Sequence, residues 1–173
     1  ISDMADISYV YQPEAQGLGH AILLARDSVG DEPFAVFLPD DVIWDQSPTI
    51  GQMLEVFGRF ESSVIAVKGV ADEQVPSLGI VDPVPLEGKI YEVTGLVEKP
   101  SPAEAPSNLA IIGRYILTPQ VFAALDSTRP GALGEIQVTD GIARLLESEP
   151  VYAYQFQGVR HDAGNPLGLI KAS

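Results

Sequence analysis

Apolar residues in this chain form short continuous runs that alternate with stretches of helical spacing. The runs at residues 34–38 and 63–70 are typical of strands that are buried on both faces of a sheet. Between them, residues 48–60 place apolar side chains at every third or fourth position, which indicates an amphipathic helix. This strand–helix–strand order predicts an α/β layered fold.

The same patterns predict the remaining elements. Further strands are expected at residues 7–12, 78–82, 91–98, 110–117 and 152–156, and further helices at 20–27, 119–125, 139–147 and from 166 onward. Prolines at positions 100, 102 and 106 predict that residues 99–106 form an extended loop. Because no linker or repeat interrupts the pattern, we expect one domain over residues 1–173 with a mixed, mostly parallel sheet.

Composition and charge narrow the classes of function. The chain has 173 residues, 46% of them apolar, which suits one soluble domain with a sizeable core. No apolar run reaches the roughly 18 residues that span a bilayer, and no secretory signal is visible, so we expect a cytoplasmic protein without a membrane partner. The formal charge of −14 disfavours nucleic acid as a partner, and a phosphate substrate would need a metal ion and a few placed cations.

Cysteine chemistry is excluded because the chain has no cysteine. That removes disulfides, thiolate nucleophiles and cysteine metal sites from consideration. The two histidines, His20 and His161, lie far apart in the sequence without helical spacing, so a zinc site built on both has little support.

Four stretches carry candidate chemistry, and the first is residues 12–21 (QPEAQGLGHA). It runs from a predicted strand through a glycine turn into a predicted helix. The glycines would let a ligand approach the backbone near a helix start, and Gln12 offers a donor and an acceptor to a nucleobase. An ordinary strand-to-helix turn is the alternative, because the stretch matches neither the dinucleotide-binding fingerprint nor a P-loop.

Acidic residues follow strands in two more of these stretches. Asp40 and Asp41 end the LPDD run of residues 38–41, and Asp162 lies in the RHDAGNP turn of residues 160–166. Ligands of open α/β sheets bind beyond the carboxyl ends of the strands, and carboxylates there suit Mg²⁺. In both places an Asx turn or a helix cap is the alternative.

The remaining stretch, residues 96–100 (LVEKP), joins Glu98 and Lys99 to a proline. Adjacent side chains on a strand point to opposite faces unless the proline reshapes the strand end. A carboxylate can hold sugar hydroxyls, and an ammonium group can neutralise a phosphate. A solvated, charged strand end is the alternative interpretation.

Together, and in this order, these stretches resemble the bacterial UTP–glucose-1-phosphate uridylyltransferases. The resemblance is carried by residues 12–21, 38–41, 98–100, 107–115, 134–140 and 162–166, and it covers essentially the whole chain. It implies a Rossmann-like nucleotidyltransferase domain, a glycosyltransferase-A-like three-layer sandwich. It also implies an enzyme that transfers a uridylyl group directly from UTP to glucose 1-phosphate, with UDP-glucose and pyrophosphate as products.

The resemblance assigns roles on the nucleotide side of the site. It implies that Gln12 and Gly17 contact the uracil. Asp40 and Asp162 are implied to hold Mg²⁺ against the phosphates and to serve catalysis, and Asp41 takes the place of Asp40 if the register is shifted by one residue.

On the sugar side, the resemblance implies that Gly79, Glu98 and Ile111 line the glucose. Lys99 is implied to be the third catalytic residue and to meet the phosphate of glucose 1-phosphate. The family also leads us to expect a homo-oligomer.

One family feature has no counterpart in residues 1–173. The family begins with a strand and a glycine-rich loop, followed by an arginine and a lysine, that cradle the triphosphate. We therefore expect a partial domain that lacks roughly the first hundred residues, together with a C-terminal helical tail, and that is inactive alone. The alternatives are a nucleotidylyltransferase for another base, such as a thymidylyltransferase, and a non-catalytic module that binds nucleotide sugars.

Overall fold

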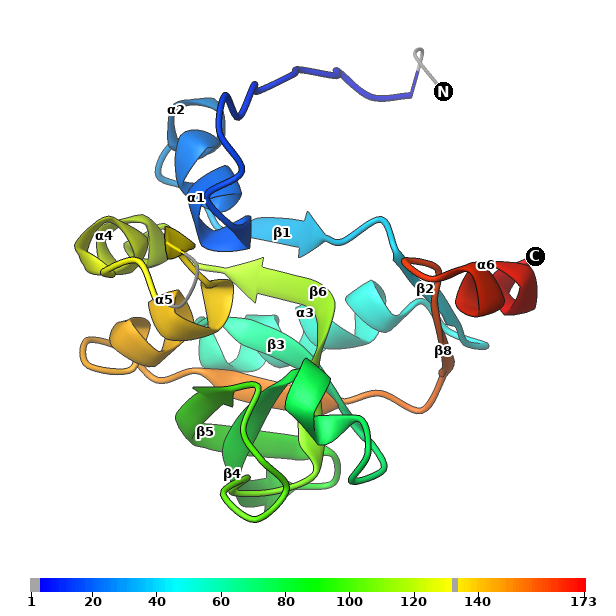
Figure 1. Cartoon of the computed structure of the whole chain (residues 1–173). Helices are drawn as coiled ribbons and strands as arrows, with labels where there is room; N and C mark the ends of the chain where they lie inside the picture. The colour runs from blue at the N-terminus through cyan, green and yellow to red at the C-terminus, as the bar shows by residue number, and fades with distance from the viewer. Residues whose placement is uncertain (1–3, 132–133) are drawn as a thin grey trace.

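A six-stranded mixed sheet forms the centre of the molecule and carries helices on both faces (Figure 1). The computed structural model describes residues 4–131 and 134–173. The strand order is β1-β6-β3-β7-β5-β4, and β2 and β8 form a separate two-stranded sheet. The strands are β1 (Phe34–Phe37), β2 (Asp41–Trp44), β3 (Val64–Gly69), β4 (Gly79–Glu87), β5 (Ile90–Glu98), β6 (Leu109–Leu117), β7 (Tyr152–Gln155) and β8 (Val159–Asp162). The helices are α1 (Leu18–Leu24), α2 (Arg26–Val29), α3 (Thr49–Phe60), α4 (Gln120–Ser127), α5 (Val138–Leu145) and α6 (Pro166–Ala172), with a 3-10 turn η1 (Val75–Ser77).

Alternate residues of β3 enter two different cores. Ile65 and Val67 pack in the core beneath α1, α4 and α5, whereas Val64 and Ala66 pack in the core beneath α3. All four are fully buried, and burying an aliphatic side chain of this size stabilises a fold by about 1.5–3 kcal/mol. The two cores make the molecule a three-layer sandwich, so the layered α/β fold expected from the sequence is confirmed.

Strand directions correct one part of the expectation. Among the strand pairs of the described residues, β3 and β7 are parallel, and the others are antiparallel. The sheet is therefore mixed, as expected, but mostly antiparallel. A short turn at Gly88 (φ 54°) joins β4 directly to β5, and a connection this short can only join antiparallel neighbours.

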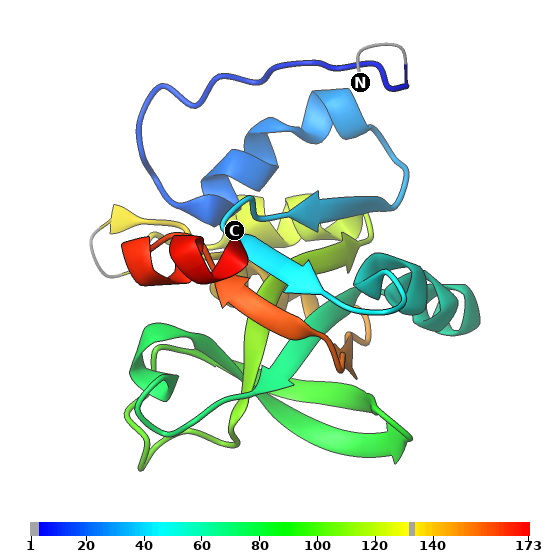
Figure 2. The ribbon, with the colours of Figure 1, turned by 90° about the vertical axis from the view of Figure 1, so that its right-hand side faces the viewer.

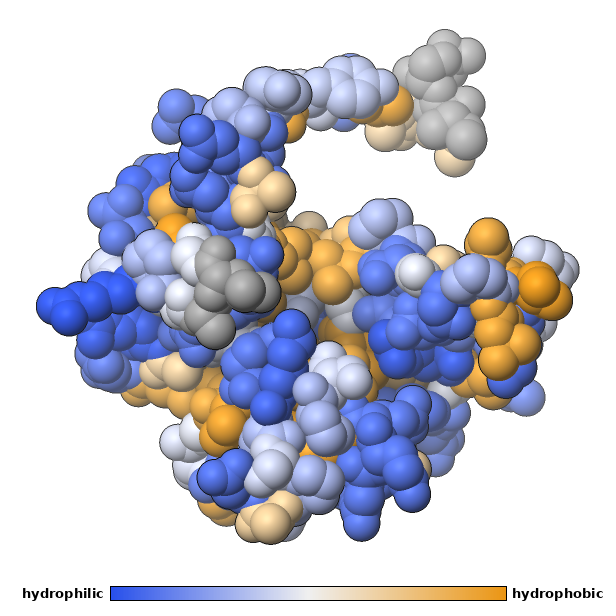
Figure 3. Space-filling view, in the orientation of Figure 1, coloured by the Kyte–Doolittle hydropathy of each residue, from blue (hydrophilic) through white to orange (hydrophobic). Residues whose placement is uncertain are grey.

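The N-terminal part of the chain departs most from the sequence pattern. Residues 7–12 were expected to form a strand, but they form an extended arm with no strand partner, on which Tyr9 and Tyr11 are exposed. Figure 3 shows this arm standing clear of the remaining surface. A strand requires a neighbour for its backbone hydrogen bonds, and none of the described residues provides one.

Strand β1 is present as expected but is not buried on both faces. It lies at the edge of the sheet. Phe34 and Val36 pack against the core under α1 and α4, while Ala35 is exposed and Phe37 keeps 52% of its surface exposed. The apolar run shows that both faces of β1 are suited to burial, but the described residues cover only one of them.

A two-stranded ribbon of β2 and β8 was missed by sequence analysis. The two strands are antiparallel, and Figure 2 shows them side by side next to α6. Each has four residues, too few for a pattern of alternation to be recognised. The ribbon joins the segment after β1 to the segment before α6, and so places two acidic turns next to each other. No helix in the described part of the chain is long and apolar enough to cross a membrane.

Candidate active site

A cleft of about 260 Å³ lies where several strand ends meet. It is bordered by the segment after β1, the ends of β5 and β8, and the beginnings of β4 and α5. Of the site residues predicted from the sequence, it brings together Asp40, Gly79, Glu98, Ile111 and Asp162. Residues from three of the four candidate stretches therefore share one cavity.

The carboxylates of Asp40 and Asp162 both lie beside Gly164 and therefore close to each other. A Cβ atom added at Gly164 would lie 3.1 Å from Asp40 Oδ2 and 3.1 Å from Asp162 Oδ1. The backbone holds this arrangement, because Ala163 N donates to Asp40 O (2.7 Å) and Gly164 N donates to Asp162 Oδ1 (3.0 Å). Asp40 is exposed and Asp162 is half-buried, so solvent and ligands can reach both carboxylates.

Asp41 has a different environment from Asp40. It is 5% exposed, and its Oδ2 accepts a hydrogen bond from Gly113 N (2.7 Å). Its Oδ1 accepts from Arg160 Nε, and Arg160 Nη2 lies 3.7 Å from Asp162 Oδ2. Both oxygens of Asp41 are thus engaged within the protein, which leaves Asp40 as the aspartate of the LPDD run that is open to the cleft.

Glu98 and its neighbours Gly79 and Thr139 also line the cleft. Glu98 is the last residue of β5 and pairs with Gly79, the first residue of β4. Thr139 Oγ1, in the first turn of α5, donates a hydrogen bond to Glu98 Oε2 (2.7 Å). Burial first, and then the carboxylates of Asp41 and Glu98, raise the pKa of the Tyr115 hydroxyl that borders the cleft.

Lys99 lies next to the cleft with an unusual backbone conformation. Its φ is 49°, in the left-handed region that side chains other than glycine rarely adopt. A regular strand would send Glu98 and Lys99 to opposite faces, but here Lys99 Nζ lies 3.6 Å from Glu98 Oε1. The strand end is therefore reshaped, so that the ammonium group of Lys99, whose side chain is 55% exposed, reaches the same side as the carboxylate.

Gln12 and Gly17 lie outside the described cleft but are linked to its wall. Gln12 Nε2 donates to Gly17 O (3.2 Å) and lies 2.9 Å from His20 Nδ1. Gly17 has a φ of 93°, and a Cβ there would approach Ile136 O to 2.7 Å, so glycine is required. Ile136 belongs to the loop that leads into α5, and thus the Gln12–Gly17 turn is packed against the base of the helix that carries Thr139.

The carboxylates of Asp40 and Asp162 suit a metal ion whose other ligands come from a bound substrate. In the described part of the chain, no group of three or more His, Asp or Glu side chains is placed to hold a metal ion. Mg²⁺ in nucleotide enzymes is held by one or two carboxylates, with substrate phosphates and water as its other ligands. Asp40 and Asp162 match that requirement, whereas Asp41 does not because its oxygens are occupied.

Sequence analysis did not single out several residues of the cleft, and Arg160 and Thr139 are the two with the most direct contacts to predicted site residues. Arg160 was regarded only as part of a turn, although its side chain is 14% exposed and bridges Asp41 and Asp162. Thr139 was regarded only as a helix start within the stretch 134–140. Their hydrogen-bond partners are distant in the sequence, because Asp41 lies 119 residues from Arg160 and Glu98 lies 41 residues from Thr139.

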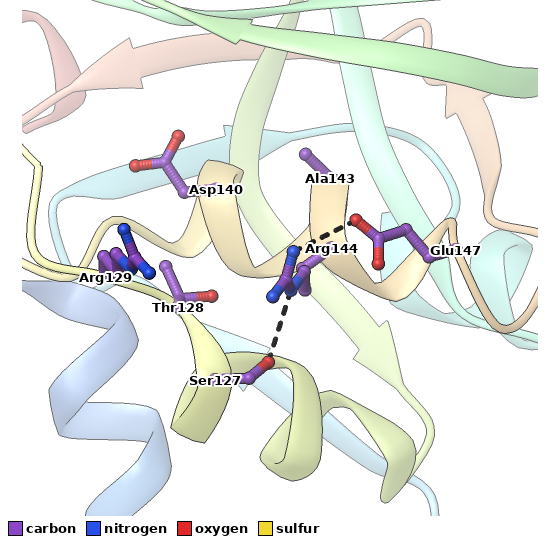
Figure 4. A pocket seen from close by; sticks show the side chains of 7 residues that line it. All are labelled: Ser127, Thr128, Arg129, Asp140, Ala143, Arg144 and Glu147. Carbon is purple, nitrogen blue, oxygen red and sulfur yellow. Dashed lines mark hydrogen bonds and ion pairs between the residues drawn. The ribbon is translucent and has the colours of Figure 1, made fainter.

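A larger hollow of about 510 Å³ lies on the other side of α5, against α4 (Figure 4). Arg144 bridges it by contacts with Glu147 (3.2 Å) and Ser127 Oγ (3.4 Å). Burial, and then the charge of Glu98, raise the pKa of Asp140 at its rim. Its two arginines and two carboxylates balance in charge, and none of the predicted site residues lines it.

Comparison with known proteins places this geometry in context. The chain is 47% identical over 169 residues to the UTP–glucose-1-phosphate uridylyltransferase of Bacillus subtilis, an alignment that covers 98% of the chain and 58% of the relative. It is 49% identical over 172 residues to the uridylyltransferase of Staphylococcus haemolyticus, with 99% of the chain and 60% of the relative covered. The chain therefore spans less than two thirds of the length of these relatives.

Solved structures agree with the sequence comparison. A UDP-glucose pyrophosphorylase complexed with UDP-glucose superimposes with a TM-score of 0.92 and 44% identity over 95% of this chain and 64% of that one. A UTP-bound enzyme of the same kind from Acinetobacter baumannii gives a TM-score of 0.82 and 41% identity over 93% of this chain and 56% of that one. The model of the nucleotidyl transferase family matches residues 2–173, and the chain accordingly belongs to the nucleotidyl transferase family.

Proposed function

We propose that the protein to which this chain belongs transfers a uridylyl group from UTP to glucose 1-phosphate and so produces UDP-glucose and pyrophosphate. The observation that carries the proposal is near-half identity to curated uridylyltransferases along almost the whole chain. The cleft that collects Asp40, Asp162 and Glu98 supports it, because it joins an open carboxylate pair to a carboxylate suited to sugar hydroxyls.

The reaction would be a direct displacement at phosphorus. An oxygen of the glucose 1-phosphate phosphate attacks the α-phosphorus of UTP, and the bond to the β,γ-pyrophosphate breaks. Transfers of this kind need alignment of the reactants and neutralisation of charge more than a protein nucleophile. The absence of cysteine from the chain agrees with such a mechanism.

The acidic residues and Lys99 have distinct roles in this proposal. Asp40 and Asp162 would hold Mg²⁺, which when bound neutralises phosphate charge and helps align the reacting groups. Lys99 lies beside Glu98 with half of its side chain exposed, where it can meet the phosphate of the sugar substrate. On a chain with a net charge of −14, this ammonium group offsets the repulsion between the carboxylates and the substrates.

Recognition of the sugar and the base would occupy separate parts of the molecule. Gly79, Glu98 and Ile111 would line the glucose, since they lie together in the cleft wall. Gln12 and Gly17 would contact the uracil, and the hydrogen bond between them preorganises that turn. The contact of Gln12 with His20 further restricts its amide group.

Pyrophosphate release by the full-length protein tests the proposal. The assay pairs UTP, dTTP, CTP, ATP and GTP with glucose, galactose and N-acetylglucosamine 1-phosphates, with and without Mg²⁺. We expect UTP and glucose 1-phosphate to be preferred, with release that depends on Mg²⁺. Preference for dTTP would instead support the thymidylyltransferase alternative, which a putative glucose-1-phosphate thymidylyltransferase from Bacillus anthracis supports at 25% identity and a TM-score of 0.74.

Binding without chemistry is the other outcome that would overturn the proposal. A protein that binds UDP-glucose in a calorimeter, yet releases no pyrophosphate with any pair, is a non-catalytic binding module. We also propose that the protein is located in the cytoplasm, where UTP and sugar phosphates are available. The homo-oligomer expected from the family stays a prediction that light scattering on the full-length protein can test.

A further inference from the structure

The two carboxylate oxygens of Glu98 have different partners. Oε2 accepts the 2.7 Å hydrogen bond from Thr139 Oγ1, while Oε1 lies 3.6 Å from Lys99 Nζ. The terminal torsion of a glutamate side chain has a broad, shallow preference of its own. Its orientation in the cleft wall is therefore decided by these two neighbours.

Thr139 is a firmly held donor. It is 4% exposed and lies in the first turn of α5. The loop before α5 is tied to the start of α1, because Gly19 N donates to Ile136 O (2.9 Å) and Ile136 N donates to Gln16 O (2.8 Å). A threonine side chain in a helix has only two common rotamers, so the hydroxyl group has little freedom to follow Glu98 if Glu98 moves.

Gly79 shows how closely this pair is packed against the cavity. A Cβ atom on Gly79 would lie 2.8 Å from Thr139 Oγ1 and 3.1 Å from Glu98 Oε2. It would also lie 3.3 Å from Ile111 Cδ1. Only glycine at this position leaves both the hydrogen bond and the adjoining space undisturbed.

We propose that Thr139 is a positioning residue that sets the affinity for the sugar phosphate by orienting Glu98. Holding Oε2 at Thr139 leaves the other lone pairs of the carboxylate to accept hydrogen bonds from sugar hydroxyls in the cleft. It also keeps Glu98 from closing on Lys99 to form a tight ion pair. Without the hydroxyl group of Thr139, Glu98 and Lys99 form an ion pair with each other, and neither side chain remains free to bind the substrate. The inference rests on the proposed function and deepens its sugar side.

The test compares Thr139→Val, Thr139→Ser and Thr128→Val in the full-length protein. Valine keeps the shape of threonine but removes the hydroxyl group, whereas serine keeps it. Thr128 is a matched control, since its hydroxyl group donates to Ala124 O (2.8 Å) at the end of α4, outside the cleft. The measurements are KM for each substrate, kcat, and the ratio of activities on glucose 1-phosphate and its deoxy analogues.

We expect Thr139→Val to raise KM for glucose 1-phosphate about tenfold, the size of one hydrogen bond to a charged group. KM for UTP should stay within about twofold of the parent, and discrimination against deoxy analogues should weaken. Thr139→Ser should restore most of the affinity, and Thr128→Val should behave like the parent. The added methyl group of Gly79→Ala would displace Thr139 or Glu98, so this variant should also raise KM for the sugar phosphate.

Several results would overturn the inference. They are an unchanged KM for glucose 1-phosphate in Thr139→Val, an equal loss for both substrates, or a Thr139→Ser variant as impaired as Thr139→Val. If Thr139→Val does not fold, a normal sugar KM in Gly79→Ala overturns it. Failure of the proposed function is recognised separately, because it appears as absence of pyrophosphate release in the parent protein. The comparison of variants is made with whichever sugar 1-phosphate the parent uses.

Discussion

Asp41 on β2 lies directly opposite Asp162 on β8 in the register of the ribbon. Only one of these two aspartates is open to ligands, because Gly113 and Arg160 occupy both oxygens of Asp41. Asp41 thereby anchors the ribbon from inside, and the residue before it, Asp40, is held beside Asp162 at the surface. If Asp40 and Asp162 bind the ligand as proposed while Asp41 supports the ribbon, mutations should separate the two roles.

Replacing Asp40 or Asp162 with asparagine should lower turnover of the full-length enzyme strongly while the fold survives. Each change keeps the size of the side chain and removes a charge that would hold Mg²⁺, so we expect a loss of roughly a hundredfold or more at saturating substrates. Turnover is measured over a range of Mg²⁺ concentrations, with Asp126→Asn, on the exposed face of α4, as the control. Near-normal turnover at saturating UTP and Mg²⁺ would show that the carboxylate pair is not the metal site.

Replacing Asp41 with asparagine should instead reduce stability. The change leaves the guanidinium group of Arg160, which is 14% exposed, without its main partner. We expect a loss of roughly 2–3 kcal/mol in the free energy of unfolding, and much less for Asp40→Asn. Urea denaturation of both variants measures the difference, and equal losses would mean that Asp41 does not anchor the ribbon.

Lys99 can be tested with a pair of variants that separate charge from backbone conformation. Lys99→Ala and Lys99→Gly both remove the ammonium group, so turnover should fall at least tenfold in each even when glucose 1-phosphate saturates. Because φ at this position is 49°, glycine should be the more stable replacement by about 1 kcal/mol. Steady-state kinetics measure the effect on turnover, and thermal melting measures the effect on stability. A Lys99→Gly variant with normal turnover would show that Lys99 takes no part in the mechanism.

Asp140 gives a prediction about pH. Burial and the nearby charge of Glu98 raise its pKa above 3.8 in the folded protein. The folded state then binds the proton more tightly than the unfolded state, so stability falls as the pH rises through the raised value. Asp140→Asn should be more stable than the parent at neutral pH, and the advantage should shrink as the pH falls toward 3.8.

Thermal melting across this range, with Asp126→Asn as the control for net charge, checks the prediction for Asp140. The exposed control should show no comparable dependence on pH. An Asp140→Asn variant that is less stable than the parent at neutral pH would show that the helix dipole of α5 outweighs the burial of the carboxyl group.

The free edge of β1 predicts how residues 1–173 behave when expressed alone. An exposed sheet edge with apolar side chains is a template for pairing with another chain, so we expect self-association. We also expect no pyrophosphate release, because residues 1–173 have no counterpart of the family's glycine-rich phosphate loop. Ala35→Lys, on the exposed side of β1, should reduce the association, whereas Ala123→Lys on α4 should not. Light scattering measures both, and a soluble, fully active monomer of residues 1–173 would contradict the prediction.

Much of the fold could be predicted from the sequence where the pattern of apolar residues was long. The helical spacing of residues 48–60 matches α3 (Thr49–Phe60), and the run at 110–117 matches β6 (Leu109–Leu117). Residues 7–12 have an equally suitable pattern, yet they form no strand. The sequence of a segment determines its propensity to form a strand, but a strand forms only where a neighbouring strand is present to pair with it.

The candidate site was predictable at strand ends and unpredictable where contacts are long-range. Asp40 and Asp162 follow strands of the sequence pattern, so the rule that ligands bind at strand ends singled them out. Glu98 was singled out by its chemistry, because a carboxylate beside Lys99 suits a sugar phosphate. Arg160 and Thr139 act through partners that only the tertiary structure brings close. At Lys99 the exception to the opposite-face rule applies, because the left-handed conformation just before Pro100 brings the ammonium group to the side of Glu98.

The β2–β8 ribbon has a consequence for synthesis of the protein. The hydrogen bond between Arg160 and Asp41 closes a loop of 119 residues, and contacts of such long separation form late, after local helices and hairpins. On the ribosome, the sheet from β3 to β6 can assemble before residue 162 has emerged. The nascent chain therefore holds Asp40 without its companion carboxylate, and the proposed Mg²⁺ site would be completed only once residue 162 has emerged.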